Sequence, residues 1–257
     1  MKLLIDLGNS RLKAALPVTG GGLRLLGEAR HREVGVEAAL AVALGGRIPQ
    51  GVAGALCANV AGEAAGRALQ AALLAHGCSR LDFLRAGREA GGVRCAYPDP
   101  SRLGADRWAA LLGARGLTDG ACLVVDAGSA LTIDAMAPGG VHLGGWIIPG
   151  LHMMLEALES RTGDLRALRQ ASLGVAPGEF PTDSGPAMEA GANLAAAGAV
   201  RVARERLEAN CGQASRLILT GGDAAILLPA LTGGEHVPEL VLQGLARAAA
   251  YFQGASA

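Results

Sequence analysis

The sequence predicts an α/β fold built from two similar domains that face a cleft, and two observations support this fold class. First, Asp6 and Asp126 each end an apolar, strand-like run, and each is followed two residues later by a glycine. The two aspartates lie 120 residues apart, close to half of the 257-residue chain, as duplication of one domain would produce. Second, predicted strands and helices alternate after each aspartate. The length suits one large domain or two of about 130 residues.

The first half begins with predicted strands and continues as alternating helices and strands. Buried strands are indicated by short apolar runs, and helices by longer segments rich in alanine and leucine, one of which is ended by Gly77. The predicted elements are extended runs at 3–6, 11–15 and 23–26, a glycine turn at 20–22, helices at 35–45, 64–76 and 104–117, and strands at 52–60 and 81–84.

The second half repeats this order, which favours duplication of one α/β unit. Its predicted elements are strands at 121–126, 131–136 and 141–148, a turn at 138–140, helices after residue 150, and a late strand at 216–220. We place the domain boundary near residue 117, which gives an N-terminal domain at 1–117 and a C-terminal domain at 118–257. We expect the N-terminal domain to carry the aspartate-glycine turn at Asp6 and the residues that bind the acceptor substrate. We expect the C-terminal domain to carry the turn at Asp126, a nucleoside-binding site and a dimer face.

Composition excludes several classes of function. Hydrophobic residues make up 51% of the chain, enough for a substantial core, while 23 basic and 23 acidic residues give no net charge. That balance, with only 3% aromatic residues, argues against nucleic-acid binding. The first residues lack a signal peptide and no apolar run approaches the roughly 20 residues of a membrane span, so we expect a cytoplasmic protein without membrane attachment.

The cysteines fit neither a disulfide framework nor a zinc site. They are odd in number and contain no close pair, so we expect most of them to be buried thiols. They are Cys57, Cys78, Cys95, Cys122 and Cys211.

The two aspartate-glycine turns have the composition of a phosphate cradle. In each, a glycine lets the backbone turn tightly and a serine follows, Ser10 or Ser129, so that backbone amides and a hydroxyl can approach a phosphate. The carboxylates of Asp6 and Asp126 would repel a phosphate unless a cation lay between them, so the pair implies a metal ion. A single copy would more often be an ordinary hairpin turn, but the second copy favours the phosphate interpretation.

A third motif predicts a site for an acceptor alcohol. Gly104-Ala105-Asp106-Arg107 opens a predicted helix, where backbone N–H groups favour anions. Asp106 would accept a hydroxyl proton while the guanidinium of Arg107 holds a carboxylate on the same substrate. The alternative is that both are ordinary charges at a helix N-terminus.

Two glycine-rich segments and one lysine add weaker signals. The segment 144–150 ends a strand on a rigid turn, where glycines allow close approach of a ligand or of a neighbouring strand. Thr220-Gly221-Gly222-Asp223 ends another strand and offers a flat seat for a purine, or an ordinary strand-to-helix turn. Lys13 is a candidate phosphate contact, although a single lysine is more often a solvated surface charge.

Taken together, these motifs resemble the type III pantothenate kinase family in order and spacing over nearly the whole chain. The segments that carry the resemblance are Asp6-x-Gly8-Asn9-Ser10-Arg11-x-Lys13, Gly104-x-Asp106-Arg107, Asp126-x-Gly128-Ser129-Ala130-x-Thr132-x-Asp134, Gly144-Gly145-x-Ile147-x-Pro149-Gly150 and Thr220-Gly221-Gly222. That family belongs to the superfamily of acetate and sugar kinases, heat-shock protein 70 and actin. The resemblance therefore implies two duplicated ribonuclease H-like, actin-like ATPase domains that face an ATP cleft.

The resemblance implies a role for each matching residue. ATP would be bound by Asp6, Leu7, Gly8, Asn9, Ser10, Arg11, Leu12, Lys13, Ser129, Gly221 and Gly222. Pantothenate would be bound by Tyr97, Gly104, Ala105, Asp106, Arg107 and, from the partner subunit of a homodimer, Thr182. Asp106 would be the catalytic base, Asp126 would hold the monovalent cation, K⁺ or NH₄⁺, and Asp6 would lie near Mg²⁺, directly or through water.

The implied activity is ATP-dependent phosphorylation of pantothenate to 4'-phosphopantothenate, the first step of coenzyme A synthesis. Ser10 and Ser129 stand where the family usually has threonine, which keeps the hydroxyl. An apolar dimer face is expected on the alanine-rich helix at 188–207, where core packing would give the same pattern. Two alternatives are a related kinase with another acceptor, which Gly104–Arg107 argues against, and a non-catalytic, actin-like or regulatory ATP-binding protein.

Overall fold

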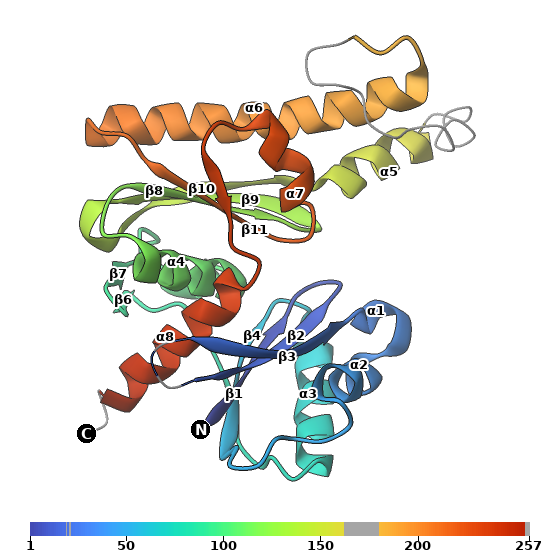
Figure 1. Ribbon diagram of the computed structural model, residues 1–257, viewed down its shortest axis with the longest axis vertical. Coiled ribbons are helices and arrows are strands. Elements are labelled where there is room, and N and C mark those ends of the chain that lie inside the picture. The colour runs from blue at the N-terminus through green and yellow to red at the C-terminus, as the bar shows by residue number, and fades with distance from the viewer. Residues whose placement is uncertain (19, 21, 162–179, 255–257) are drawn as a thin grey trace. The chain divides into compact units, whose positions relative to one another are not determined.

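The computed structural model describes residues 1–18, 20, 22–161 and 180–254, which fall into two compact units. The first unit comprises Met1–Asp119, Gly139–His142 and Glu239–Ala257, and the second comprises Gly120–Pro138 and Leu143–Pro238. The described strands form two sheets, one of five strands and one of seven, and the seven-stranded sheet ends in the short strands β7 and β6. The strands are drawn as arrows in Figure 1.

The sheet of the first unit has the strand order β3-β2-β1-β4-β5. Its first three strands are antiparallel neighbours, whereas the last two run parallel to β1. The strands are β1 (Lys2–Leu7), β2 (Leu12–Pro17), β3 (Leu23–Ala29), β4 (Gly54–Asn59) and β5 (Leu81–Phe83). The central strand β1 is buried at Leu3, Leu4 and Ile5, as the apolar run in the sequence predicts.

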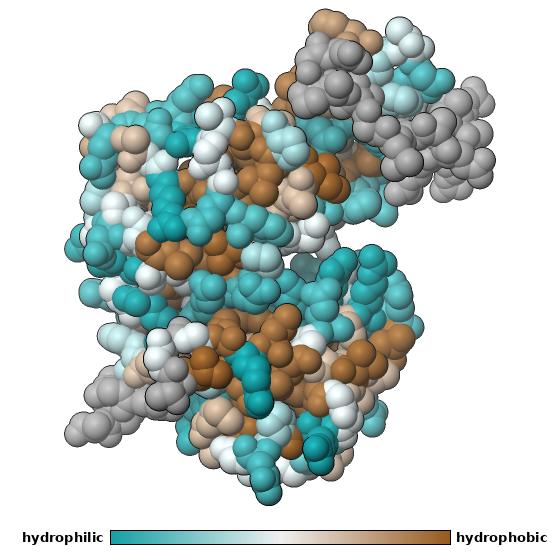
Figure 2. All heavy atoms as spheres, viewed as in Figure 1, coloured by the Kyte–Doolittle hydropathy of each residue, from teal (hydrophilic) through white to brown (hydrophobic). Residues whose placement is uncertain are grey.

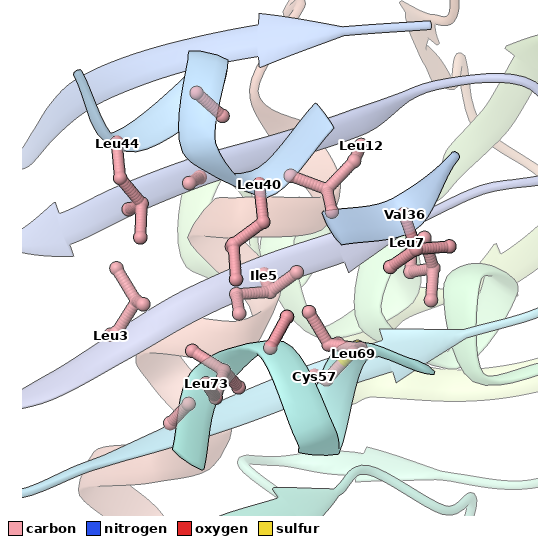
Figure 3. Close-up of a cluster of buried hydrophobic side chains, with 14 of the residues drawn as sticks. Leu3, Ile5, Leu7, Leu12, Val36, Leu40, Leu44, Cys57, Leu69 and Leu73 are labelled. Atoms are coloured by element: carbon pink, nitrogen blue, oxygen red, sulfur yellow. The ribbon is translucent and has the colours of Figure 1, made fainter. Parts of the chain in front are cut away.

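Helices cover both faces of this sheet. One face packs on α2 (Val36–Leu44) and α3 (Glu63–Ala75), and Figure 3 shows Leu40 and Leu73 of these helices close to Ile5. A short helix α1 (His31–Val34) precedes α2, while α4 (Ala105–Leu117) and α8 (Leu240–Gly254) pack together and contact β4. A Cβ on Gly113 of α4 would collide with the backbone of α8, so glycine permits this close helix contact.

The rest of the first unit is a small hairpin and a turn of 3₁₀ helix before α4. The hairpin pairs β6 (Glu89–Ala90) with β7 (Val93–Arg94), and the turn is η1 (Pro100–Arg102). The start of β10 also belongs to this unit, because Val141 pairs with Arg94.

The second unit repeats the strand order of the first, as β10-β9-β8-β11-β12. The first two strands along the chain are antiparallel, and β11 and β12 continue the sheet in parallel, as β4 and β5 do. The strands are β8 (Cys122–Ala127), β9 (Ala130–Ala137), β10 (Val141–Pro149), β11 (Arg216–Thr220) and β12 (Gly234–His236). This repeated order confirms the predicted duplicated α/β fold.

Helices of the second unit follow β10 and β11. Among the described residues these are α5 (Leu151–Arg161), α6 (Ser184–Cys211), α7 (Ala224–Leu227) and the 3₁₀ turn η4 (Leu228–Ala230). Another 3₁₀ turn, η2 (Pro138–Gly140), joins β9 to β10. The long helix α6 buries Ala196 and Val200 in a core shared with β8 and β9. It begins at Asp183, whose carboxylate accepts the N–H of Gly185 at 3.0 Å, and ends at Gly212 in the left-handed region.

Most of the predicted elements are confirmed, including helices at α2, α3 and α4 and the strands of both sheets. The sequence did not predict β6, β7, β12 or α8. The strands β6 and β7 have two residues each, too few for an alternation of apolar and polar residues to show in the sequence. Because α8 packs on α4, the segment 239–257 belongs to the first compact unit, while the duplicated domains at 1–117 and 118–257 remain a proposal. Part of the turn predicted at 20–22 lies outside the described residues.

The structure also tests the predictions made for the cysteines and for membrane-spanning segments. None of the five cysteines forms a disulfide, and three of them, Cys57, Cys78 and Cys122, are buried. Apolar side chains remain exposed in patches over both units on the face drawn in Figure 2. Among the residues that the structure describes, none of the helices combines the length and the apolar character needed to cross a membrane.

Candidate active site: two strand turns and a helix start

The first turn joins β1 to β2 and contains four residues, from Gly8 to Arg11, between the paired Leu7 and Leu12. It is closed by the N–H of Gly8, which donates to the carbonyl of Arg11 at 3.0 Å. Leu7 and Leu12 are fully buried, so only their backbone could contact a ligand. Next to the turn, Asp6 on β1 lies opposite Lys13 on β2 in the antiparallel strand pair.

Glycine is not needed in this turn for its backbone angles, which corrects the predicted reason for its presence. Neither Gly8 nor Gly128 of the second turn has a positive φ. A Cβ on Gly8 would come no closer than 3.5 Å, to the carbonyl oxygen of Arg11, which is an ordinary contact. A side chain could therefore be accommodated at Gly8 without backbone strain or collision.

Charged side chains surround the first turn. Glu28 on β3 lies 3.0 Å from the guanidinium of Arg11 and 4.0 Å from the ammonium of Lys13. Cys57 on β4 is close to Asp6, and burial, together with the negative charge of Asp6, raises the pKa of its thiol. Cys57 therefore stays protonated and is no nucleophile.

The second turn joins β8 to β9 and is one residue shorter. Only Gly128, Ser129 and Ala130 lie between the paired Ala127 and Leu131, and the N–H of Gly128 donates to the carbonyl of Ala130 at 3.1 Å. Ser129 is exposed at its tip.

Asp126 sits between two threonines on neighbouring strands. It pairs with Thr132 on β9 and with Thr220 on β11, so the ends of three adjacent strands meet beside its carboxylate. The segment after Thr220 was predicted to seat a nucleoside, and the sheet register places it next to the second turn.

Two glycines pack directly on the backbone of the second turn. The N–H of Gly150 donates to the carbonyl of Ser129 at 3.1 Å, and a Cβ on Gly150 would lie 2.6 Å from that oxygen. Gly221 has φ +91°, and its Cβ would lie 2.5 Å from Oδ1 of Asp126. For the segment 144–150, Gly150 thus shows the predicted close approach of neighbouring backbone. Gly221 makes a similarly close approach. Gly222, by contrast, is exposed with no atom within 4 Å of its Cβ position.

The turn, Gly150 and the start of α7 line a small hollow. The N–H of Asp223 donates to the carbonyl of Ala127 at 2.9 Å, and His152 lies 3.7 Å from the carboxylate of Asp223. The hollow is lined by Ala127, Gly128, Leu131, Gly150, Leu151, Asp223 and Leu227. The carboxylate of Asp126 and the carbonyl of Ala127 both border the space that a Cβ on Gly221 would fill, so oxygen ligands of the kind that hard cations prefer come together here.

The third predicted site lies where α4 begins, in the first unit. Gly104 is the N-cap residue and Ala105 the first residue of the helix. Oδ1 of the half-buried Asp106 accepts the N–H of Arg107 at 2.7 Å. A Cβ on Gly104 would lie 2.6 Å from that Oδ1, so glycine is required for the carboxylate to keep this position.

Arg107 is held against Tyr97 rather than extended into solvent. Its side chain is buried, donates a hydrogen bond of 3.2 Å to the Tyr97 hydroxyl, and has its guanidinium carbon 5.9 Å from the centre of the Tyr97 ring. The ring of His142 stacks on Tyr97 with centroids 6.0 Å apart, and the N–H of Ala96 donates to Nδ1 of His142 at 3.4 Å. The structure thus brings Tyr97, Asp106 and Arg107 together.

Thr182 lies apart from these groups in the chain, in the second unit. It is exposed and directly precedes Asp183, the N-cap of α6. The residues that follow Thr182 start the helix, because Asp183 caps it and Pro186 lies in its first turn.

Sequence reasoning missed His142, His31 and Arg32. Side chains of the latter two contact the carbonyls of Gly8 and Asn9. The only sequence signal for His142 is its position just after the Pro138-Gly139-Gly140 turn, which does not reveal its stacking on Tyr97. Within the described ranges, which omit 162–179, no cluster of three or more histidine, cysteine, aspartate or glutamate residues could bind a metal on its own.

Comparison with known proteins decides the family. The family model described as type III pantothenate kinase matches residues 2–206. The chain is 38% identical over 253 residues to the type III pantothenate kinase of Azoarcus sp. (strain BH72), covering 97% of this chain and 91% of that one. It is 41% identical to the Chromobacterium violaceum protein of the same name, covering 97% and 99%. The chain belongs to the type III pantothenate kinase family. The predicted family and enzyme class, an ATP-dependent pantothenate kinase, are thereby confirmed.

Solved structures agree on the fold. A Campylobacter jejuni protein assigned to the Baf family of transcriptional activators aligns with a TM-score of 0.60 and 20% identity, covering 98% of this chain and 99% of that one. A Sinorhizobium meliloti protein assigned as a 2-dehydro-3-deoxygalactonokinase aligns with a TM-score of 0.59 and 16% identity, covering 97% and 98%. At such identities the likeness shows the shared fold alone.

Proposed function

We propose that this chain transfers the γ-phosphoryl group of ATP to the primary hydroxyl of pantothenate, with Asp106 as the general base. The arrangement at the start of α4 carries this proposal: Asp106 is anchored through Oδ1 by the N–H of Arg107, and Gly104 leaves room for its carboxylate. One carboxylate oxygen is thus held by the backbone, which orients the carboxylate, and the proposal assigns Oδ2 to accept the proton of the substrate hydroxyl.

In the proposed reaction the hydroxyl oxygen of pantothenate attacks the γ-phosphorus while the bond to the bridging oxygen of ADP breaks. The hydroxyl proton passes to Asp106, and the products are 4'-phosphopantothenate and ADP. Because the transition state of phosphoryl transfer is loose, alignment and charge neutralisation supply most of the rate enhancement.

The carboxylate of pantothenate is assigned to Arg107. Its guanidinium is buried and fixed against Tyr97, so it loses little side-chain entropy when it binds an anion. The N-terminus of α4, at Gly104 and Ala105, adds backbone N–H groups to this site.

The two turns are assigned to the nucleotide. Residues from Asp6 to Lys13 would contact the phosphates, with backbone N–H groups at Asn9 and Ser10 and charges at Arg11 and Lys13. Ser129 would contact ATP from the second turn, and Gly221 with Gly222 would border the nucleoside. The packing of the turn does not require glycine at Gly8, and a glycine there lets a phosphate approach the backbone closely, which supports this assignment.

Cations are assigned to the two aspartates. The carboxylate of Asp126 and the backbone carbonyl of Ala127 fit K⁺ or NH₄⁺. Asp6, near the end of β1, fits Mg²⁺ that is otherwise bound by phosphate and water. When bound, the divalent ion neutralises negative charge on the phosphates.

A homodimer belongs to the same proposal, with Thr182 reaching the pantothenate site of the partner. Helix α6 buries one face against the sheet, yet Leu194 and Val202, eight residues apart on another face, remain 66% and 44% exposed. Gly191 and Gly198 lie on that exposed face and have no atom within 4 Å of their Cβ positions, which favours close approach of a second helix. A cytoplasmic location also belongs to the proposal.

The substitution Asp106→Asn tests the assignment of the base. It keeps the size and the hydrogen bond to the N–H of Arg107 but removes the basic oxygen, so we expect kcat to fall about 100-fold or more with ATP binding nearly unchanged. The matched control is Asp99→Asn, because Asp99 is an exposed carboxylate that caps η1, a role that asparagine keeps. Near-normal turnover of Asp106→Asn would show that the base lies elsewhere.

A further inference from the structure

A short helix that the proposed mechanism does not use contacts the outer side of the first turn. Nε2 of His31 lies 2.7 Å from the carbonyl oxygen of Gly8, and Nε of Arg32 donates to the carbonyl oxygen of Asn9 at 2.7 Å. Both residues belong to α1, and both contacts are made to consecutive backbone carbonyls of the proposed phosphate turn. The carbonyl of Gly8 can only accept, so Nε2 of His31 is the protonated ring nitrogen.

These two hydrogen bonds fix the direction of the amide groups in the turn. In a planar trans peptide the C=O of one residue and the N–H of the next point in opposite directions. Holding the carbonyl of Gly8 toward His31 therefore turns the N–H of Asn9 away from α1. In the same way, Arg32 on the carbonyl of Asn9 turns the N–H of Ser10 away from α1.

We infer that His31 and Arg32 are positioning residues, which orient the amides of Asn9 and Ser10 toward the phosphates of the nucleotide. This inference rests on the proposed function, because it takes the first turn as the phosphate-binding turn. Amides that are oriented before the ligand arrives bind an anion without further ordering, so the two side chains contribute to nucleotide affinity without touching it.

The position of α1 is itself fixed by the core. His31 is only 8% exposed, and its carbonyl accepts the N–H of Gly35, which has φ +84° and joins α1 to α2. Directly after Gly35, the side chain of Val36 enters the core, where Figure 3 shows it next to Leu7 at the end of β1. The turn and the helix that holds it are thus attached to the same cluster of buried side chains.

Two substitutions remove the contacts separately. His31→Phe keeps an aromatic ring but loses the donor, and Arg32→Ala removes an exposed side chain whose loss leaves the core intact. For each variant we expect the KM for ATP to rise about fivefold to tenfold, as loss of one hydrogen bond predicts, with the KM for pantothenate unchanged. Arg32→Lys, which retains a donor, should recover part of the affinity.

Equilibrium binding separates a positioning role from a general structural one. ADP and adenosine share the nucleoside and differ in phosphate, so both variants should weaken ADP binding and leave adenosine binding unchanged. Glu33→Gln is the matched control, because Glu33 lies on the same helix and pairs with Arg30 at the surface. Equal losses for ADP and adenosine, or unchanged ADP binding in Arg32→Ala, would overturn the inference.

The wild-type protein distinguishes this inference from the proposed function. If wild-type protein binds ADP and phosphorylates pantothenate while both variants match it, only the positioning role is wrong. If wild-type protein neither binds ADP nor phosphorylates pantothenate, the assignment of the turn to phosphate fails, and the positioning role fails with it.

Discussion

The two aspartate-glycine turns start from the same pattern and are held in different ways. The first has four residues between its paired leucines, carries Arg11, and is contacted from outside by the side chains of His31 and Arg32. The second has three such residues, and residues 127–133 contain no charged side chain. It is packed instead by the backbones of Gly150 and Gly221.

This difference shows that a duplicated element can keep its strand order while its two copies specialise. Side chains hold the first turn, so substitutions there should change ligand binding and leave the fold intact. Backbone packing holds the second turn, so substitutions at its glycine neighbours should first change stability. The following predictions test this division, beginning with the largest expected effect.

Alanine at either packing glycine should strongly destabilise the protein. A Cβ on Gly221 would collide with Asp126 and adopt a strained positive φ, and one on Gly150 would collide with Ser129. We expect a loss of about 3 kcal/mol or more in the free energy of unfolding, measured by chemical denaturation. Gly222→Ala is the matched control and should be nearly neutral in stability, because nothing lies within 4 Å of that Cβ position. Wild-type stability of Gly221→Ala would refute the backbone packing of the second turn.

Asparagine at the two aspartates should separate the two metal requirements. Asp126→Asn should raise the concentration of K⁺ needed for half-maximal activity about tenfold or more, because one anionic ligand is lost, with a smaller change in the Mg²⁺ requirement. Asp6→Asn should do the reverse. Titration of each variant with KCl and MgCl₂ measures both effects, and identical shifts in the two variants would contradict the separate assignments.

Alanine at Gly8 should impair ATP binding without unfolding the protein. Its Cβ would make only an ordinary contact at 3.5 Å, so we expect a change in unfolding free energy within about 1 kcal/mol. The added methyl group would keep a phosphate from the backbone, and the KM for ATP should rise about fivefold. Kinetics and thermal unfolding of one preparation would check both parts. A large loss of stability with a normal KM would show that the first turn, like the second, depends on backbone packing.

The smallest expected effect concerns acid stability in the second unit. Glu208 on α6 accepts hydrogen bonds from the backbone N–H and the hydroxyl of Ser215 and from Arg204, and these bonds lower its pKa. A lowered folded pKa stabilises the folded protein above the unfolded value of about 4.3, and this contribution is lost as pH falls through the folded pKa. Glu208→Gln should therefore reduce stability slightly at neutral pH and flatten its decline below about pH 4.3. An unchanged decline in Glu208→Gln, measured by urea denaturation at several pH values, would show that Glu208 does not contribute.

Local patterns in the sequence were enough to predict both turns and the start of α4. Buried strands such as β1 and β8 show as apolar runs, and Gly104 before Asp106 places a carboxylate at a helix start. Two segments of candidate site residues therefore lie on elements that the sequence predicts. They are Asp6 to Lys13, at the first turn, and Gly104 to Arg107, at the start of α4.

Contacts between distant segments could not be predicted in the same way. His142 stacks on Tyr97 from 45 residues further along the chain, and His31 contacts Gly8 across 23 residues. The packing of α8 on α4 depends on Gly244 meeting Ala109, which no periodicity in either helix reveals. Such contacts follow from the order of strands in the sheet, which fixes which segments become neighbours.

The most direct test of the central claim is a coupled assay of ADP release by the purified protein with Mg-ATP, with mass spectrometry of the product. Pantothenate is compared with other hydroxy acids and sugars as acceptor, and K⁺, NH₄⁺ and Na⁺ are each supplied as the only monovalent cation. We expect ADP and 4'-phosphopantothenate to form with pantothenate alone, and only with K⁺ or NH₄⁺. Phosphorylation of a different acceptor, or ATP binding without acceptor-dependent ADP release, would contradict the account.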